Sequence, residues 1–229
     1  MFWTEENDAA AQSSVPDDVV DLAFAINCPT LPVDHAWALS QRLHEALPWL
    51  DEEQQAGIHL IHGAASGNGW YRPEESANAL LHLSRRARLR LRLPRSRLDD
   101  ARELTGSTLD ISGHLLQVGA SEEHPLNPLP TLFSRYVITR QAVGEEVFLQ
   151  QALEHLMKLD IDCRKLLCGI THTLGFPEGP VFTRSLMVAE LTPEHSVRLQ
   201  QAGLGEGRKV GCGLFIPHKG IKPVKQDSE

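Results

Sequence analysis

The pattern of apolar and polar residues in the first half of the chain predicts short strands separated by helices. Residues 21–26 alternate loosely, as a strand does, and residues 34–47 place their apolar side chains on one helical face until Pro48 ends the pattern. Shorter apolar runs bounded by turn residues follow. They predict strands at 58–61 and twice within 79–93, a helix at 96–104, and paired strands at 108–111 and 114–118.

The clearest period in this half lies in the segment 88–93, where arginine and leucine alternate strictly. A strand directs successive side chains to opposite faces, so three leucines lie on one face and three arginines on the other. We expect the leucine face to be buried. The arginine face either contacts a ligand or is simply solvated, and the pattern alone leaves both open.

The second half repeats the same order of elements. Its periods predict a strand at 134–140, a helix at 145–159, strands at 166–174 and 182–191, a helix at 193–202 and a short strand at 214–216. Two successive βαββαβ arrangements indicate an α+β fold built from two tandem ferredoxin-like, RRM-like modules. The halves share this pattern without clear sequence identity.

Composition divides the chain into five predicted segments. The two modules are separated by a proline-rich stretch and flanked by polar ends. The segments are an acidic mobile N-terminus at 1–18, an N-terminal module at 19–124, a linker at 125–130, a C-terminal module at 131–218 and a basic tail at 219–229.

A glycine-rich stretch, residues 203–213, contains five glycines around Arg208 and Lys209. Glycine permits positive φ angles and close approach of the backbone, and backbone N–H groups in such loops bind phosphate. A dinucleotide fingerprint needs a strand before the glycines and a helix after them, which is the reverse of the order here. The absence of a Gly-Lys-Ser/Thr end also excludes a P-loop. The stretch therefore indicates a partner that carries phosphate.

Net charge is −8 over 229 residues, which at first disfavours a nucleic-acid partner. Six acids lie in residues 1–21, however, and without them the remainder carries about −2, while seven arginines lie within 85–97. Binding to a polyanion depends on a local basic patch rather than on the total net charge, so the net charge does not exclude RNA as a partner. The four cysteines show no paired C-x-x-C spacing, and no apolar run is long enough for a membrane span. We therefore expect a cytoplasmic protein, and we expect no cofactor.

Helix, glycine stretch and terminal strand together resemble the CRISPR-associated precursor-crRNA endoribonucleases, the repeat-processing branch of the RAMP superfamily. The resemblance spans residues 21–218 and is closest to the MYXAN-type branch; it is carried by 31–35, 57–61, 92–94 and 199–213. It implies binding of CRISPR repeat RNA and a single cut without a metal. It also implies that the crRNA 3′ hairpin is retained and that other subunits of a surveillance complex are partners.

The implied reaction uses the 2′-OH as nucleophile and gives a 2′,3′-cyclic phosphate and a 5′-OH. Histidine is the side chain best suited to move a proton near neutral pH. The family usually places this histidine on or beside the first helix, which favours His35, directly after the expected N-cap Asp34, over His44. His59 is a further candidate that could face His35. The other histidines, His62 among them, are interpreted as surface or structural residues.

The predicted RNA contacts are basic side chains and the glycine backbone. Tyr71, Arg135 and Tyr136 are possible additional hydrogen-bond donors. The pair His59-x-x-His62 on a strand would direct its side chains to opposite faces, so no metal site is predicted. The full set of predicted contacts is Arg85, Arg86, Arg88, Arg90, Arg92, Gly203, Gly205, Arg208, Lys209, Gly211 and Gly213.

Two other functions stay open at this point. The chain could be a noncatalytic RAMP-type subunit that only holds crRNA in a surveillance complex. It could also be an unrelated ferredoxin-like domain that binds a nucleotide.

Overall fold

The computed structural model describes residues 17–62, 79–140 and 143–218. Strands and short helices alternate along both halves, with every strand pairing antiparallel. The first half contains β1 (Val19–Asn27), β2 (Thr30–Pro32), α1 (Ala36–Ala46), η1 (Pro48–Asp51), β3 (Gly57–His59), β4 (Leu80–His82), β5 (Arg88–Pro94), η2 (Arg95–Arg97), α2 (Leu98–Arg102), β6 (Thr108–Ile111) and β7 (His114–Pro125).

The second half contains fewer and longer elements. In chain order these are β8 (Leu132–Thr139), α3 (Glu145–Lys158), β9 (Lys165–Leu174), β10 (Val181–Ala189), α4 (Pro193–Ala202), η3 (Arg208–Val210) and β11 (Ile216–Pro217). The prediction of a mixed α and β fold is confirmed. The helix predicted at 193–202 has the observed bounds, with the Thr192 hydroxyl accepting a hydrogen bond from the His195 N–H as an N-cap.

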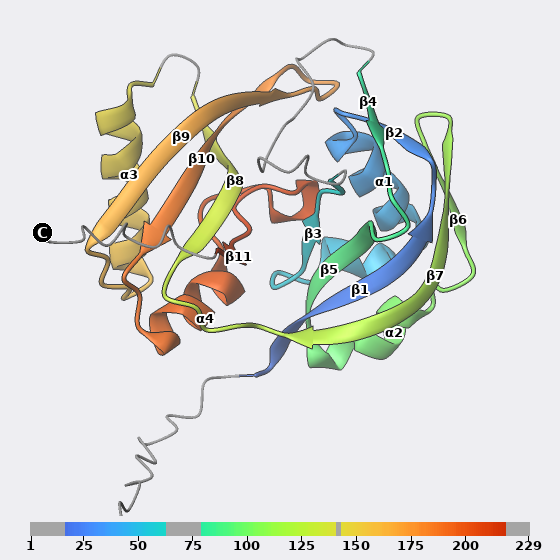
Figure 1. The fold of residues 1–229 in the computed structure, drawn as a ribbon, viewed down its shortest axis with the longest axis horizontal. Helices are drawn as coiled ribbons and strands as arrows, with labels where there is room; N and C mark the ends of the chain where they lie inside the picture. Colours follow the sequence, from blue (N-terminus) through green and yellow to red (C-terminus); the bar gives the residue numbers. More distant parts are fainter. Residues whose placement is uncertain (1–16, 63–78, 141–142, 219–229) are drawn as a thin grey trace, which may run out of the picture.

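Two main sheets stand side by side (Figure 1). The first has the strand order β3-β5-β1-β7-β6 and the second has the order β11-β8-β10-β9. In Figure 1 α1 lies against the first sheet, and α3 and α4 lie against the second. The glycine stretch, with η3, lies between the two sheets.

A small two-stranded sheet, β2 with β4, was not predicted. Leu31 precedes a proline, and such a residue avoids the helical region, so the chain stays extended through β2. The helix therefore begins after His35, which occupies the N-cap position expected for Asp34. The Asp34 carboxylate instead accepts a hydrogen bond from the Gly175 N–H of the second half, at 2.7 Å.

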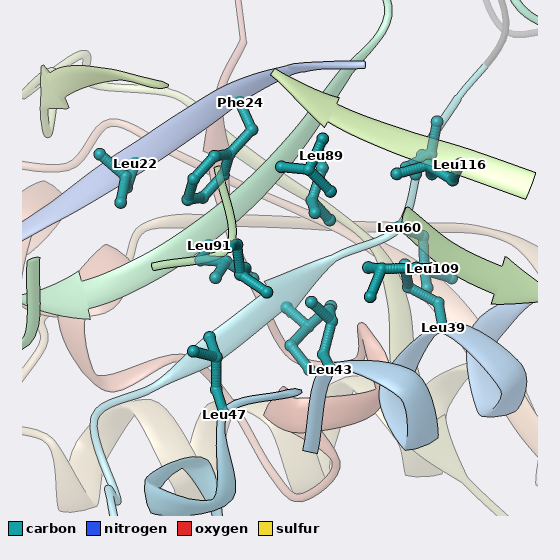
Figure 2. Packing of buried hydrophobic residues seen from close by; sticks show 14 of the residues in the cluster. Leu22, Phe24, Leu39, Leu43, Leu47, Leu60, Leu89, Leu91, Leu109 and Leu116 are labelled. Carbon is teal, nitrogen blue, oxygen red and sulfur yellow. The ribbon is translucent and has the colours of Figure 1, made fainter. Parts of the chain in front are cut away.

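The leucine face of β5 is buried as predicted (Figure 2). Leu89 and Leu91 pack beside Phe24 of β1 and against Leu39 and Leu43 of α1. The same cluster includes Tyr136, Leu174 and Cys212 from the second half, while a separate core lies between the second sheet and its helices. The apolar core of the first half therefore continues across the boundary between the sheets.

The opposite face of β5 carries the polar link between the two halves. Arg92 is fully buried and binds both carboxylate oxygens of Asp21, through Nε at 2.8 Å and Nη2 at 3.0 Å. Its Nη1 donates to the carbonyl oxygens of Gln200 and Phe215, at 2.9 and 2.8 Å. Gln200 lies in the last turn of α4, where carbonyls lack helical partners. One guanidinium thus binds the backbone on both sides of the glycine stretch.

The ion pair keeps Asp21 charged inside the protein. Burial alone would raise the pKa of this carboxyl, but the charge of Arg92, helped by His59, outweighs it and holds the pKa well below its usual range. Each partner is buried, so each depends on the other for stabilisation.

The glycine stretch packs tightly between the two halves of the chain. Arg208 Nη2 donates to the Gln55 carbonyl at 2.9 Å, and Lys209 Nζ donates to the Asp51 carbonyl at 2.8 Å. Burial, followed by the charge of Arg92, lowers the pKa of the Arg208 guanidinium to about 10. Gly211, at φ +87°, lies so close to Leu60 that a β-carbon would come within 2.4 Å of the leucine Cγ.

We predict that Arg92→Met lowers the free energy of unfolding by about 3–5 kcal/mol, because it leaves Asp21 charged and buried without its partner. Urea-induced unfolding measures the loss. The matched control is Arg88→Met on the same strand, whose exposed side chain should cost less than about 0.5 kcal/mol. Adding Asp21→Leu to Arg92→Met should recover part of the stability. Equal losses for Arg92→Met and Arg88→Met would contradict the link.

Gly211→Ala and Gly205→Ala form a second matched pair. Both glycines have positive φ, so each alanine costs about 1–2 kcal/mol in backbone strain. Only Gly211 also meets Leu60, since a β-carbon on Gly205 has no atom within 4 Å. Thermal unfolding should show Gly211→Ala to be the less stable variant by at least about 1 kcal/mol. If Gly205→Ala were instead the less stable variant, the glycine stretch would not be tightly packed at Gly211.

Candidate functional site

An open pocket of about 240 Å³ lies between the two sheets. β3 and β5 form one wall, β8 forms the other, and Gly211 and Leu214 contribute from the glycine stretch and the segment after it. Its polar lining is almost entirely cationic or aromatic. These side chains are Arg86, Arg88, Arg90, Arg135, His59, His62 and Tyr136.

The arginine face of β5 explains the charge of the pocket. Arg88 is exposed, Arg90 is half-buried and Arg92 is fully buried, because β5 runs into the junction between the sheets. Arg86 joins Arg88 and Arg90 in the lining, and Arg85 is exposed nearby in sequence. The guanidinium of Arg92 is buried and binds Asp21 and two backbone carbonyls, so this geometry does not support the prediction that Arg92 binds RNA. Its partners make it a structural residue.

His59 lies on the wall of the pocket next to Asp21. Its side chain is 13% exposed, and its Nε2 is 3.5 Å from Asp21 Oδ1. Burial lowers the pKa of His59, although the nearby Asp21 carboxylate opposes the shift. The ring is therefore neutral near pH 7. The catalytic role of His59 stays a prediction.

His62, just beyond the end of β3, forms a second polar group with β8. It is exposed, and its Nδ1 is 3.3 Å from Arg135 Nη1. Its ring faces that of Tyr136 at a centroid distance of 6.3 Å and an angle of 30°. Tyr136 in turn meets the ring of His172 edge-on at 5.3 Å. The segment after β3, together with β8 and β9, thus brings two imidazoles, a guanidinium and a phenol together.

A bulge in β8 explains why two consecutive residues line the same pocket. Ser134 is opposite Leu186 and Val137 is opposite Arg184, so Arg135 and Tyr136 together face the single residue Ser185. In a regular strand these two side chains would lie on opposite faces. A bulge turns one of them, and bulges are common beside active sites for this reason.

The first two histidine candidates occupy different surroundings. His35 is 2% exposed, its Nδ1 lies 2.9 Å from the Pro32 carbonyl, and its Nε2 accepts the Ile61 N–H at 3.1 Å. Because a carbonyl only accepts, Nδ1 carries the proton. His44 Nδ1 lies 2.7 Å from the Ser40 carbonyl. Neither residue lines the pocket, and their catalytic role stays a prediction without support from this geometry.

The glycine stretch contributes less to the pocket than predicted. Of the glycines named from the sequence, only Gly211 is in the lining, and Gly203, Gly205 and Gly213 are not. Arg208 and Lys209 already donate to backbone carbonyls of the first half. Phosphate binding by these residues stays a prediction. Tyr71 lies outside the described residues.

Sequence reasoning missed His62 and His172. Strand alternation predicts opposite faces for His59 and His62, but β3 ends at His59, so the alternation does not extend to His62. Within residues 17–62, 79–140 and 143–218, no three His, Cys, Asp or Glu side chains gather as a possible metal site. None of the helices in these ranges is long and apolar enough to cross a membrane.

Comparison with known proteins places the chain in a family. The model of the family described as Cas6 Crispr matches residues 20–220. The CRISPR-associated endonuclease Cas6 of Myxococcus xanthus (strain DK1622) is 32% identical over 198 residues, which cover 86% of this chain and 81% of that protein.

Solved structures agree at the level of the fold. A structure named CRISPR associated protein Cas6 has a TM-score of 0.58 at 11% identity, covering 88% of this chain and 100% of its own. A Cas6-related protein from Pyrococcus furiosus has a TM-score of 0.58 at 12% identity, covering 86% of this chain and 97% of its own. A RAMP protein described as binding different RNA substrates has a TM-score of 0.60 at 13% identity, with coverages of 86% and 98%. The chain belongs to the Cas6 family of CRISPR-associated proteins.

Proposed function

We propose that this protein is an endoribonuclease that cuts CRISPR repeat RNA to give mature crRNA, without a metal ion. The observation that carries the proposal is the pocket between the sheets, which combines arginines with histidines. Family membership supports it, since the relative from Myxococcus xanthus is named an endonuclease.

The arginines account for RNA binding in a chain that is acidic overall. Arg86, Arg88 and Arg90 approach the pocket from β5 and the turn before it, and Arg135 approaches from β8. Guanidinium groups bind phosphate oxygens through paired N–H donors and keep their charge at every physiological pH. A cluster of this kind binds the backbone and shape of an RNA hairpin, so we place the repeat stem along the β5 side of the pocket.

The histidines account for cleavage. Attack of a 2′-OH on the adjacent phosphorus needs a group that accepts the hydroxyl proton, and neutral imidazole is suited to this near pH 7. Arginine beside it stabilises the charge that develops on the phosphate oxygens. The products are a 2′,3′-cyclic phosphate and a 5′-OH. No step of this route requires a metal.

We also infer that each half is a ferredoxin-like module. In the second half the chain order β8-α3-β9-β10-α4-β11 folds into the sheet order β11-β8-β10-β9, which is the βαββαβ arrangement. The first half follows the same order through β3-β5-β1-β7 and adds β6 at the edge. The boundaries 19–124 and 131–218, the retention of the crRNA 3′ hairpin, further subunits as partners and a cytoplasmic location belong to this proposal.

The direct test is incubation of the purified protein with its repeat RNA in EDTA. The expected result is a single cut that leaves a 2′,3′-cyclic phosphate, and none when the nucleotide before the cut carries 2′-deoxyribose. Binding without cleavage would overturn the enzyme and support the noncatalytic crRNA-binding subunit. An absence of any affinity for the repeat would overturn both and leave the nucleotide-binding domain.

RNA binding along β5 predicts a specific effect of charge. The double variant Arg88→Ala, Arg90→Ala should weaken repeat binding at least about tenfold and reduce the salt dependence of log K by about 2, one for each lost phosphate contact. Filter binding at several salt concentrations measures both quantities.

Arg102→Ala is the matched control for that experiment. Arg102 lies on α2 and is paired with Asp99 at 2.6 Å, away from the pocket lining. The affinity of Arg102→Ala for repeat RNA should stay within about twofold of that of the parent protein. The exposed ion pair that the variant loses contributes little energy. Equal losses in both variants would mean that RNA responds to total charge and not to β5.

A further inference from the structure

We propose that His62 is the general base of the cleavage reaction and that Arg135 binds the scissile phosphate. This rests on the proposed endoribonuclease function and assigns its chemistry to one place in the pocket. That place is the bulge of β8 together with the residue three positions after the end of β3.

The contact between the two side chains fixes the starting state of the imidazole. Arginine can only donate hydrogen bonds, so the Nδ1 that faces Arg135 Nη1 at 3.3 Å holds a lone pair. A ring whose Nδ1 is unprotonated is neutral and can accept a proton. The scissile phosphate is a stronger acceptor for the guanidinium than a neutral imidazole. When Arg135 turns to the phosphate, the lone pair of His62 becomes available beside it.

The surroundings hold this pair in place while leaving it accessible. Tyr136 is only 5% exposed and packs between His62 and His172. Its carbonyl accepts the Gly213 N–H at 2.7 Å, which ties the bulge to the glycine stretch. On the other side, the Ile61 N–H binds buried His35 and so fixes the backbone one residue before His62. His62 itself is exposed at the pocket, where a substrate can reach it.

The other candidate histidines fit the reaction less well. His35 already uses both ring nitrogens with backbone groups and is 2% exposed. His59 lies in the pocket, but its Nε2 faces Asp21 and its side chain is 13% exposed. Asp21 is itself held by Arg92. His59 therefore belongs to the buried link between the sheets, whereas His62 is open to substrate.

The proposed step exchanges one bond at phosphorus for another. The 2′-oxygen forms a bond to phosphorus while the bond between phosphorus and the 5′-oxygen breaks, and the 2′-OH proton passes to His62. The leaving 5′-oxygen takes a proton from water, and the imidazolium returns its proton to solvent. Arg135 donates to the nonbridging oxygens, where negative charge increases in the transition state.

The test is the single-turnover cleavage rate of His62→Ala and His62→Gln. Loss of a general base should slow cleavage by about 10²- to 10⁴-fold, while repeat affinity stays within about threefold of the parent protein. Added imidazole should restore part of the rate of His62→Ala but not of His62→Gln, since only alanine leaves space for it. His155→Ala, an exposed histidine on α3, is the control and should cut at the parent rate.

A modified substrate distinguishes a general base from a general acid at His62. With a 5′-bridging sulfur at the cut, the leaving group needs no proton, so a base variant stays slow and an acid variant recovers. Recovery of His62→Ala on this RNA, or cleavage of normal RNA within threefold of the parent rate, would overturn the assignment. If the parent protein itself does not cut, the proposed function fails first and the assignment fails with it.

Arg135→Gln and Arg135→Lys test the phosphate contact. Glutamine should lower the rate at saturating RNA by at least about tenfold, and lysine, which keeps the charge but not the paired donors, should restore part of it. A change confined to affinity would place Arg135 among the binding arginines and overturn its part in the reaction.

Discussion

The ion pair between Arg92 and Asp21 is the interaction on which the rest of the arrangement depends. The pair itself lies within the first sheet, and the same guanidinium donates to the carbonyls of Gln200 in α4 and of Phe215 before β11, so it links the first sheet to the second half of the chain. Because the same strand continues outward through Arg90 and Arg88, burial of its inner end directs the outer arginines into the pocket. A structural link and a binding surface are thus formed by one alternating strand.

The glycine stretch has contacts that indicate a structural role. Its composition indicates phosphate binding, yet its two cations donate to carbonyls of the first half, and Gly211 packs closely against Leu60. Its tie to the Tyr136 carbonyl also supports the bulge that presents Arg135. We therefore regard the stretch mainly as a packed segment that holds β8 opposite β5.

Local periodicity allowed most of the fold to be predicted. The leucines of β5 and the bounds of α4 follow from neighbours within a few residues, and both were confirmed. Burial of Arg92 could not be predicted in this way, because its partners Gln200 and Phe215 are more than 100 positions away. The position of His62 depends on where β3 ends and on a bulge in β8, and neither has a signal in the sequence around His62.

A structure of the complex with repeat RNA that carries 2′-deoxyribose before the cut would show directly whether His62 and Arg135 meet the scissile phosphate. We expect this phosphate within about 3 Å of the Arg135 guanidinium, with the modified 2′-carbon next to the His62 ring. A phosphate bound instead by the backbone of the glycine stretch, or beside His35 at the start of α1, would contradict it.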